Sequence, residues 1–429
     1  MANSIVYPRK LAVRVLTRVL SDHEPLDEVL KELAVDLPSD SAAWLQEICS
    51  GTLRWKGRLD LILDSTALKK KPSGWLRKML LLASYQLVVQ DRAPAPLVVS
   101  ETVSEIKAKE GNAPAQFANA CLRKIADHAL QWRELALPEK SSDFEAAQWA
   151  SLPEWFWKKI LKQKGFGWSM RFAQASLDRP VLWLRARDSE GSSSLTADWA
   201  ERGPIPGALR ERLDGQVRSR GLVTEKSGFQ EGEWIVQDIS SQLLIAEVMA
   251  EIRPVFNHAP LQALDLCAAP GGKSVGLAWS GARVTATDFV EKRVPLLRQT
   301  VNRVDPTGSL IRVIPWSELH LHWNQDLIWV DAPCTGTGIL RRHPDVRWLR
   351  REEELEGLVQ TQRELLRKAW ANARSGSFVV YSVCSVLKEE GPDAIHAAEL
   401  SSFQVKAWSL EPHSAPHGDG FWAALLRKP

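Results

Sequence analysis

The chain has little cysteine, and its spacing excludes a disulfide framework or a zinc site. Its 429 residues include five cysteines, and no two have the C-x-x-C spacing. A disulfide framework needs more, closely spaced cysteines, and a structural zinc site needs paired thiols. We therefore expect no metal ion, a cytoplasmic location and five reduced thiols, at positions 49, 121, 267, 334 and 384.

Long apolar runs and a strong charge imbalance are also missing. No apolar segment approaches the roughly 20 residues that span a bilayer, and the N-terminal residues lack the apolar core of a signal peptide. The net charge is only +3. We therefore expect no membrane partner, and any nucleic acid must bind through local basic patches. The length predicts two or three domains.

The first third of the chain is rich in helical periodicity and poor in β signals. From Arg9 to about His128, apolar residues recur at the spacing of one helix face. This pattern predicts an all-α bundle over residues 1–140. Cys49 and Cys121 lie on apolar faces, so we assign both thiols to its core.

A mixed segment follows the bundle. Residues 137–143 read as a linker, residues 153–161 open a helix, and the alternation over residues 181–187 predicts a strand. Residues 145–233 are therefore predicted to form a small α+β connector domain.

A glycine-rich turn separates a strand from a helix in the last part of the chain. The predicted strand ends at Cys267, and Ala268–Ser274 follow it. A P-loop would need glycine at position 267 and a longer turn, so the sequence argues against a nucleoside triphosphatase. The next predicted strand ends at Asp288, at about the distance of a ribose-binding acid. NAD or S-adenosylmethionine would fit, although the G-x-G-x-x-G motif of dinucleotide sites is absent.

Seven strands are predicted in residues 234–429. They lie at residues 264–267, 283–288, 310–314, 327–331, 378–384, 403–408 and 421–426. A parallel sheet that ends in a hairpin-like antiparallel strand is the plan of class-I methyltransferases. The predicted fold class is thus multidomain: an all-α bundle, a small α+β connector and a C-terminal Rossmann-like α/β domain.

Cys334 and Cys384 each follow a predicted buried strand, so both lie at carboxyl ends, where α/β sheets bind ligands. A free cysteine is most often a small buried apolar residue. A methyl donor beside a pyrimidine would give a thiol another use. A thiolate that adds to C6 makes C5 electron-rich enough to take a methyl group, which splits one difficult step into easier ones.

Several motifs resemble known families. Residues 49–54, 80–87 and 117–123 are similar to the NusB-type RNA-binding helical domain. Residues 265–273, Asp331–Gly338, Arg341–Asp345 and Tyr381–Val386 together resemble the RNA cytosine-5 methyltransferases of the Nol1/Nop2/Sun family. The resemblance covers essentially the whole chain. It implies S-adenosylmethionine as cofactor, 16S ribosomal RNA as partner, and a monomer.

The resemblance also implies roles for individual residues. Cys384 matches the nucleophile of the family, and Cys334 matches the cysteine that assists product release. In DNA cytosine methyltransferases a Pro-Cys cysteine attacks instead, so Cys334 is the alternative nucleophile. Asp331 matches a carboxylate beside the base or the cofactor. The remaining matches are the cofactor-binding Cys267, Ala268, Ala269, Pro270, Gly271, Gly272, Lys273, Asp288 and Arg293, and the substrate-side Arg341, His343, Pro344 and Asp345.

The chain departs from the family at a few positions. Val383 replaces a threonine before the nucleophile, and only Ser317 or Glu318 could replace an aspartate near the adenine. The family's Glu-Glu-Asn reads Glu389-Glu390-Gly391. Two other functions stay open: an inactive RNA-binding assembly factor, and a transfer-RNA cytosine-5 methyltransferase.

Overall fold

The chain forms two compact units in the computed structural model, which describes residues 8–67, 71–90, 92–137, 141–188, 199–212, 223–256, 260–416 and 418–429. Unit 1 comprises Met1–Arg179 and Leu340–Glu352, and unit 2 comprises Pro180–Ile339 and Glu353–Pro429. The predicted linker at residues 137–143 lies partly outside the described residues. The division into three domains, at residues 1–140, 145–233 and 234–429, stays a prediction. Among the described helices, none has both the length and the apolarity that a bilayer crossing requires.

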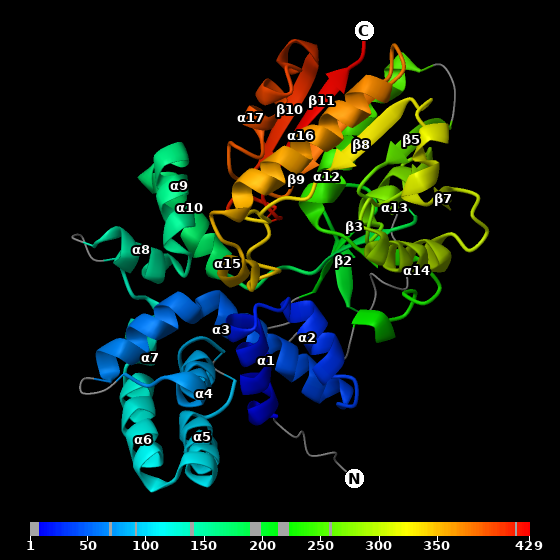
Figure 1. Ribbon diagram of the computed structural model, residues 1–429. Helices are drawn as coiled ribbons and strands as arrows, with labels where there is room; N and C mark the ends of the chain where they lie inside the picture. Colours follow the sequence, from blue (N-terminus) through cyan, green and yellow to red (C-terminus); the bar gives the residue numbers. More distant parts are fainter. Residues whose placement is uncertain are drawn as a thin grey trace. The chain divides into compact units, whose positions relative to one another are not determined.

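Unit 1 is helical, as its periodicity predicted (Figure 1). Its helices are α1 (Arg9–Ser21), α2 (Leu26–Leu33), α3 (Ser39–Thr66), α4 (Gly74–Tyr85), α5 (Ala95–Glu110), α6 (Asn112–Asp127), α7 (Ala129–Arg133), α8 (Asp143–Ala150), α9 (Glu154–Lys164), α10 (Phe166–Leu177) and α15 (Val346–Leu349). A π-helical turn, Gln86–Gln90, continues α4. Helices α8 to α10, in the predicted connector, belong to this unit.

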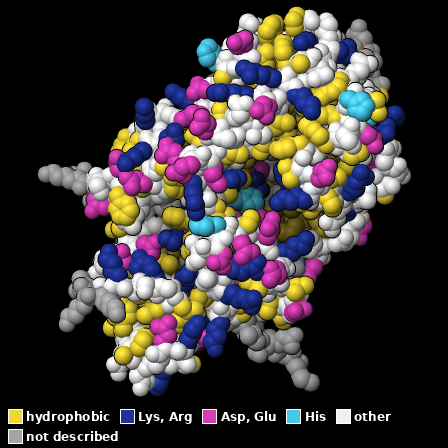
Figure 2. All heavy atoms as spheres, in the orientation of Figure 1, with side chains coloured by type: hydrophobic (Ala, Val, Ile, Leu, Met, Phe, Trp, Pro, Cys, Tyr) yellow, Lys and Arg dark blue, Asp and Glu magenta, His cyan; other side chains and the backbone are white. Residues whose placement is uncertain are grey.

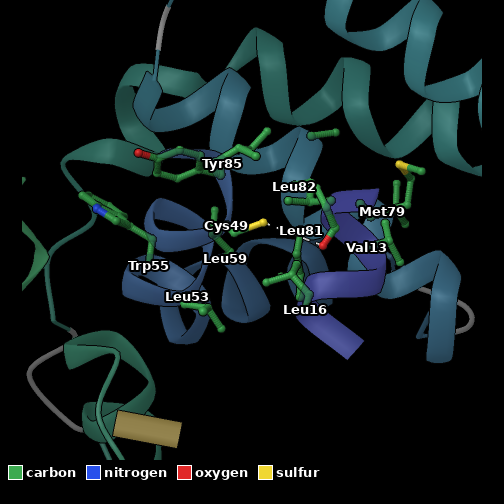
Figure 3. Close-up of a cluster of buried hydrophobic side chains, with 14 of the residues drawn as sticks. Val13, Leu16, Cys49, Leu53, Trp55, Leu59, Met79, Leu81, Leu82 and Tyr85 are labelled. Atoms are coloured by element: carbon green, nitrogen blue, oxygen red, sulfur yellow. Dashed lines mark hydrogen bonds between the residues drawn. The ribbon is translucent and has the colours of Figure 1, made fainter. Parts of the chain in front are cut away.

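The core of unit 1 lies between α1, α3 and α4 (Figure 3). Leu16, Cys49 and Leu82 are fully or almost fully buried there. A Cβ atom on Gly51 would lie 2.0 Å from Cζ of Tyr85, so only glycine lets α3 approach this ring. Cys49 and Cys121 are both buried, as predicted, and burial raises the pKa of each thiol.

Unit 2 contains two sheets. The smaller sheet is antiparallel, in the order β2-β3-β1-β4, with strands β1 (Trp183–Ala186), β2 (Ala200–Arg202), β3 (Ala208–Glu211) and β4 (Trp234–Val236). Gln237 follows β4 and donates from Nε2 to the carbonyl of Gly272 at 2.7 Å. Arg185 of β1 donates to Ser280 Oγ at 2.8 Å. The strands of the predicted connector are therefore attached to the larger α/β part.

The larger sheet has the predicted seven strands, in the order β10-β11-β9-β8-β5-β6-β7. Its strands are β5 (Leu261–Asp265), β6 (Ala282–Ala286), β7 (Ile311–Val313), β8 (Leu327–Asp331), β9 (Phe378–Val383), β10 (Gln404–Leu410) and β11 (Phe421–Arg427). Strand β11 runs antiparallel to both neighbours, and the pairs from β9 to β7 are parallel. The predicted hairpin at the end of the sheet is confirmed.

Helices cover both faces of this sheet (Figure 1). On one face, side chains of α12 (Ile239–Ile252), α13 (Gly272–Trp279) and α14 (Val294–Val304) share a core with Trp329 and Val380. On the other, α16 (Glu354–Asn372) and α17 (Pro392–Ala397) pack against the alternate residues Val330 and Tyr381. Because strands β8 and β9 are buried on both faces, they read as continuous apolar runs in the sequence.

The surface carries charges of both signs. On the face shown in Figure 2, Lys and Arg side chains lie interspersed with Asp and Glu side chains. This agrees with the small net charge of +3.

Candidate active site

Strands β8 and β9 bring the two predicted cysteines together. The strands are adjacent and parallel, and Asp331 at the end of β8 pairs with Ser382 near the end of β9. Both strands therefore end at the same edge of the sheet, and the loops that follow them start there. Cys334 and Cys384 lie on the loops that follow, and their Sγ atoms are 3.2 Å apart. The two cysteines are 50 positions apart in the sequence, and α15, α16 and β9 lie between them, so the fold and not the sequence brings the two thiols together.

The two thiols differ in their environments. Cys334 is buried, whereas Cys384 is half-buried. The hydrogen bond with Cys384, followed by burial, raises the pKa of the Cys334 thiol well above its usual range. At neutral pH Cys334 therefore carries its proton, and its neighbour Cys384 is the thiol with access to solvent.

A network of hydrogen bonds fixes Asp331 beside the thiols. Its Oδ2 atom lies 2.6 Å from Nζ of Lys273, and Ser382 Oγ donates to its Oδ1 at 2.7 Å. The indole of Trp329 donates to Ser382 Oγ at 3.0 Å. Burial lowers the pKa of Lys273, but the charge of Asp331 and the hydrogen bond to it outweigh burial, and the net shift is upward. Lys273 is therefore a cation.

The predicted glycine turn lies between β5 and α13. Gly271 has φ +114°, and its N–H donates to the carbonyl of Ala268 at 2.6 Å, which closes the turn. Helix α13 begins at Gly272, so the last residues of the predicted turn, Gly272 to Ser274, already belong to the helix. Cys267 is buried at the start of the loop. Burial, followed by the charge of Asp288, raises its pKa well above its usual range, so this thiol is inert.

Two buried carboxylates lie near this turn. Asp288 follows β6, and its oxygens accept from the N–H groups of Ala269 at 3.1 Å and Val290 at 2.9 Å. Arg293 donates to the carbonyl of Ala269 at 2.7 Å. Asp265 at the end of β5 accepts from Ser274 Oγ at 2.6 Å, and burial raises its pKa to about 7.

This edge of the sheet fits a positively charged nucleoside-type ligand. Asp265 Oδ1 is buried and makes no hydrogen bond within the described residues. Asp265, Asp288 and Asp331 lie close enough for their charges to interact. Only two cations, Lys273 and Arg293, pair with these three carboxylates among the described residues. Carboxylates attract a cation, and Asp288 can also accept from ribose hydroxyls, so a sulfonium nucleoside suits this donor set.

The residues predicted to shape the substrate side lie in unit 1. Arg341 and Asp345 are buried there. The carbonyl of Arg341 accepts two hydrogen bonds from Arg54, and Asp345 Oδ2 accepts from the N–H of Leu26 at 3.0 Å. His343 Nδ1 lies 3.4 Å from a carboxylate oxygen of Asp27. These contacts anchor the segment to helices α2 and α3. A role of Arg341, His343, Pro344 and Asp345 toward a substrate stays a prediction.

Comparisons with known proteins cover both units. The family model described as "16S rRNA methyltransferase RsmB/F" matches residues 256–426, and the "NusB family" model matches residues 7–127. "Ribosomal RNA small subunit methyltransferase B" of Proteus mirabilis is 31% identical over 434 residues, which cover 98% of each chain. Its counterpart in Photorhabdus laumondii is 29% identical over 442 residues, with the same coverage.

The chain belongs to the RsmB family of 16S rRNA methyltransferases. The resemblance seen in the sequence motifs is thereby confirmed, and so is the NusB-like nature of the first helices. Like other members of the RsmB family, the protein is an S-adenosylmethionine-dependent rRNA methyltransferase. The crystal structure of PH0851, 20% identical, covers 99% of both chains with a TM-score of 0.69, which supports the fold.

Sequence reasoning missed the groups that join the two cysteine loops of this RsmB-family chain. Glu390 is fully buried and accepts hydrogen bonds from Thr335 and Ser385, the residues that follow Cys334 and Cys384. The sequence marked Glu390 only as part of a degenerate motif. The sequence places a hydroxyl residue directly after each cysteine and a carboxylate six residues after Cys384, but no pattern in it joins the three.

Proposed function

We propose that the protein transfers a methyl group from S-adenosylmethionine to C5 of one cytosine in 16S rRNA, through a covalent bond between Cys384 and C6. The observation that carries this proposal is the 3.2 Å contact between the sulfur atoms of Cys384 and Cys334 at the sheet edge beside Asp331 and Lys273. Methylation at a nitrogen or at a ribose oxygen has no need for a thiol pair.

Cys384 supplies the nucleophile in this mechanism. Its thiolate attacks C6, which forms an S–C6 bond and makes C5 electron-rich. The bound cofactor supplies a methyl group carried on a sulfonium, and C5 forms the new bond to carbon. A general base then takes the C5 proton, and the electron pair of the broken C5–H bond restores the C5–C6 double bond. The S–C6 bond breaks, and Cys384 leaves as a thiolate.

Cys334 assists that last step. Its raised pKa, caused first by the hydrogen bond with Cys384 and then by burial, keeps a proton on its sulfur. The Cys384 sulfur gains negative charge as it leaves C6. A thiol 3.2 Å away can donate a hydrogen bond to that charge, and such a bond is stronger than one between neutral groups. Cys334 therefore favours release without itself attacking the base.

Asp331 is assigned to the cytosine. Lys273 and Ser382 hold one oxygen each, so the carboxylate cannot turn away. A carboxylate has about four acceptor sites, which leaves capacity for the exocyclic amine of a cytosine. The loop from Cys267 to Lys273, Asp288 and Arg293 is assigned to the cofactor, with Asp288 accepting from its ribose.

Bisulfite sequencing of total RNA tests the proposal. A strain that lacks the protein should lose 5-methylcytosine at one position of 16S rRNA, and the wild-type gene should restore it. Cys384→Ala should not restore it, whereas Cys121→Ala, which alters a buried thiol of unit 1, should. Loss of a mark in transfer RNA instead would identify the other substrate class. An unchanged 16S pattern would overturn the proposal, and restoration by Cys384→Ala would overturn the nucleophile.

A further inference from the structure

Glu390 is a buried carboxylate that the steps above do not use. Its side chain has no exposure to solvent. Within the described residues, no Lys, Arg or His lies at ion-pair distance from it. A carboxylate taken out of water is unfavourable unless hydrogen bonds compensate. Glutamate at such a position therefore needs a reason other than packing.

Four hydrogen bonds satisfy this carboxylate. Oε1 accepts from the backbone N–H of Thr335 at 2.7 Å and from Nε2 of Gln362 at 3.0 Å. Oε2 accepts from the hydroxyls of Thr335 and Ser385, each at 2.5 Å. Thr335 directly follows Cys334, and Ser385 directly follows Cys384. One side chain thus holds the residue after each thiol.

Glu390 is itself fixed from two sides. The hydroxyl of Tyr381, in β9, donates to the backbone carbonyl of Glu390 at 2.6 Å. Gln362 of α16 contacts the carboxylate and also donates to the carbonyl of Pro333, at 2.9 Å. The acceptor is therefore anchored to the strand before Cys384 and to the helix that packs on this face of the sheet.

Further hydrogen bonds join the two loops on the same side. The N–H of Gly338 donates to the carbonyl of Cys384 at 3.0 Å, and the hydroxyls of Thr337 and Ser385 are 3.0 Å apart. A Cβ atom on Gly338 would lie 2.1 Å from the carbonyl oxygen of Gly420, so the backbones approach closely here. These contacts tie the loop after β8 to the loop after β9.

We infer that Glu390 is a positioning residue that sets the separation of the Cys334 and Cys384 sulfurs by binding the residue after each of them. The inference rests on the proposed covalent function for its catalytic consequence, but the geometry it describes exists without substrate. The charge of Glu390 also adds to the rise in the pKa of Cys334, after the larger effects of the Cys384 hydrogen bond and of burial. Glu390 would thus affect both the place of the Cys334 sulfur and the proton that this sulfur carries.

Binding of a reagent that bridges two thiols depends directly on the distance between the Cys334 and Cys384 sulfur atoms. Phenylarsine oxide forms two As–S bonds with a close pair of thiols and releases water, so its tight binding requires both sulfurs at once. Wild-type protein without RNA should bind it, and Cys334→Ser and Cys384→Ser should not. Glu390→Ala should bind it at least about tenfold more weakly, which corresponds to 1.4 kcal/mol. Glu390→Gln should lie between, because its Nε2 cannot accept from the two hydroxyls.

Methylation kinetics give the second measurement. Glu390→Gln should lower kcat while the KM for S-adenosylmethionine stays within about twofold, because within the described residues no hydrogen bond joins Glu390 to the glycine turn. Glu389→Gln, which removes a carboxylate at the neighbouring position, should leave both kcat and phenylarsine oxide binding unchanged. If Glu390→Ala does not fold, Ser385→Ala takes its place, because it removes one of the four bonds and leaves the carboxylate satisfied by three.

The outcomes separate the inference from the function. Folded Glu390 variants that bind phenylarsine oxide as tightly as wild type would overturn the positioning role, whatever base is methylated. Weakened binding without any cytosine methylation by the wild-type protein would support the positioning role and overturn the proposed function. Weakened binding together with a lower kcat supports both.

Discussion

The sulfur atoms of Cys334 and Cys384 lie 3.2 Å apart, yet only Cys384 has appreciable access to solvent. In the proposed mechanism the base meets the half-buried thiol, and the buried thiol acts on its neighbour. The difference in exposure would thus give two chemically identical groups different tasks. It also makes the order of the two cysteines testable by trapping.

Cys334→Ala should accumulate a covalent protein–RNA adduct, because Cys384 can still attack C6 but leaves slowly. Turnover should fall by about a hundredfold or more, the usual contribution of a proton-donating group. A denaturing gel with labelled RNA would show the adduct as a slower band. The double variant Cys334→Ala/Cys384→Ala should show none. An adduct that forms with Cys384→Ala instead would make Cys334 the nucleophile.

Asp288→Asn should weaken S-adenosylmethionine binding by about tenfold or more, because a hydrogen bond to a charged group contributes about 1.5–3 kcal/mol. Calorimetry would give the dissociation constant. Glu291→Gln is the matched control, since it removes an exposed carboxylate three residues further along the chain and should not change affinity. Equal affinities for wild type and Asp288→Asn would show that Asp288 does not bind the ribose.

Asp265 should make stability fall as pH rises. Burial raises its pKa from 3.8 to about 7, so the folded state holds a proton that the unfolded state releases above about pH 4. Its contribution to the free energy of unfolding is therefore full below pH 4 and lost as pH rises to about 7, by about 4 kcal/mol in total. Urea unfolding of the cofactor-free protein at pH 4, 5.5 and 8 would measure it.

Asp265→Asn should remove this trend, so that the variant gains stability relative to wild type as pH rises. Asp305 should have the opposite effect on the change of stability with pH, and Asp305→Asn tests this. Burial raises the pKa of Asp305, but the backbone N–H groups of Leu310 and Ile311 outweigh burial, and the net shift is downward. Its stabilising effect is present at neutral pH and lost in acid. A pH trend that persists in Asp265→Asn would assign the trend to another group.

The seven strands, the antiparallel end of the sheet and the place of the two cysteines at carboxyl ends of strands could be predicted from the sequence. Apolar runs before Cys334 and Cys384 indicated buried parallel strands, and parallel neighbours end at one edge. The tie through Glu390 could not be predicted, because a hydrogen bond between residues 55 apart has no period in the sequence. The contacts of Arg341 and Asp345 could not be predicted either. Their position just after the Cys334 motif suggested the catalytic part, whereas their hydrogen-bond partners lie 287 and 319 positions earlier in the chain.

Arg347 should be the most sensitive residue of that segment. It is almost fully buried in unit 1, and its guanidinium donates to the carbonyls of Arg54, Ser151, Ser176 and Leu340 at 2.9–3.2 Å. Arg347→Met would leave these acceptors without the donor, so we expect a loss of at least about 3 kcal/mol in urea unfolding.

Arg351→Met is the control for this prediction, because it changes an exposed arginine of the same segment. Its effect should stay within about 0.5 kcal/mol, as is usual for surface positions. Similar stabilities for the two variants would show that the four bonds of Arg347 contribute little beyond what methionine packing replaces.

The assignment of Leu340–Glu352 to unit 1 has a consequence for synthesis on the ribosome. When residue 179 emerges, helices α1 to α10 are complete, but the carbonyls that Arg347 satisfies and the N–H of Leu26 still lack their partners. The helical unit can reach its final form only after residue 352 has left the exit tunnel, by which time β5 to β8 and the Cys334 loop are also outside. Truncation at Arg179 would therefore not release an intact helical unit, because Leu340–Glu352 would stay with the other fragment.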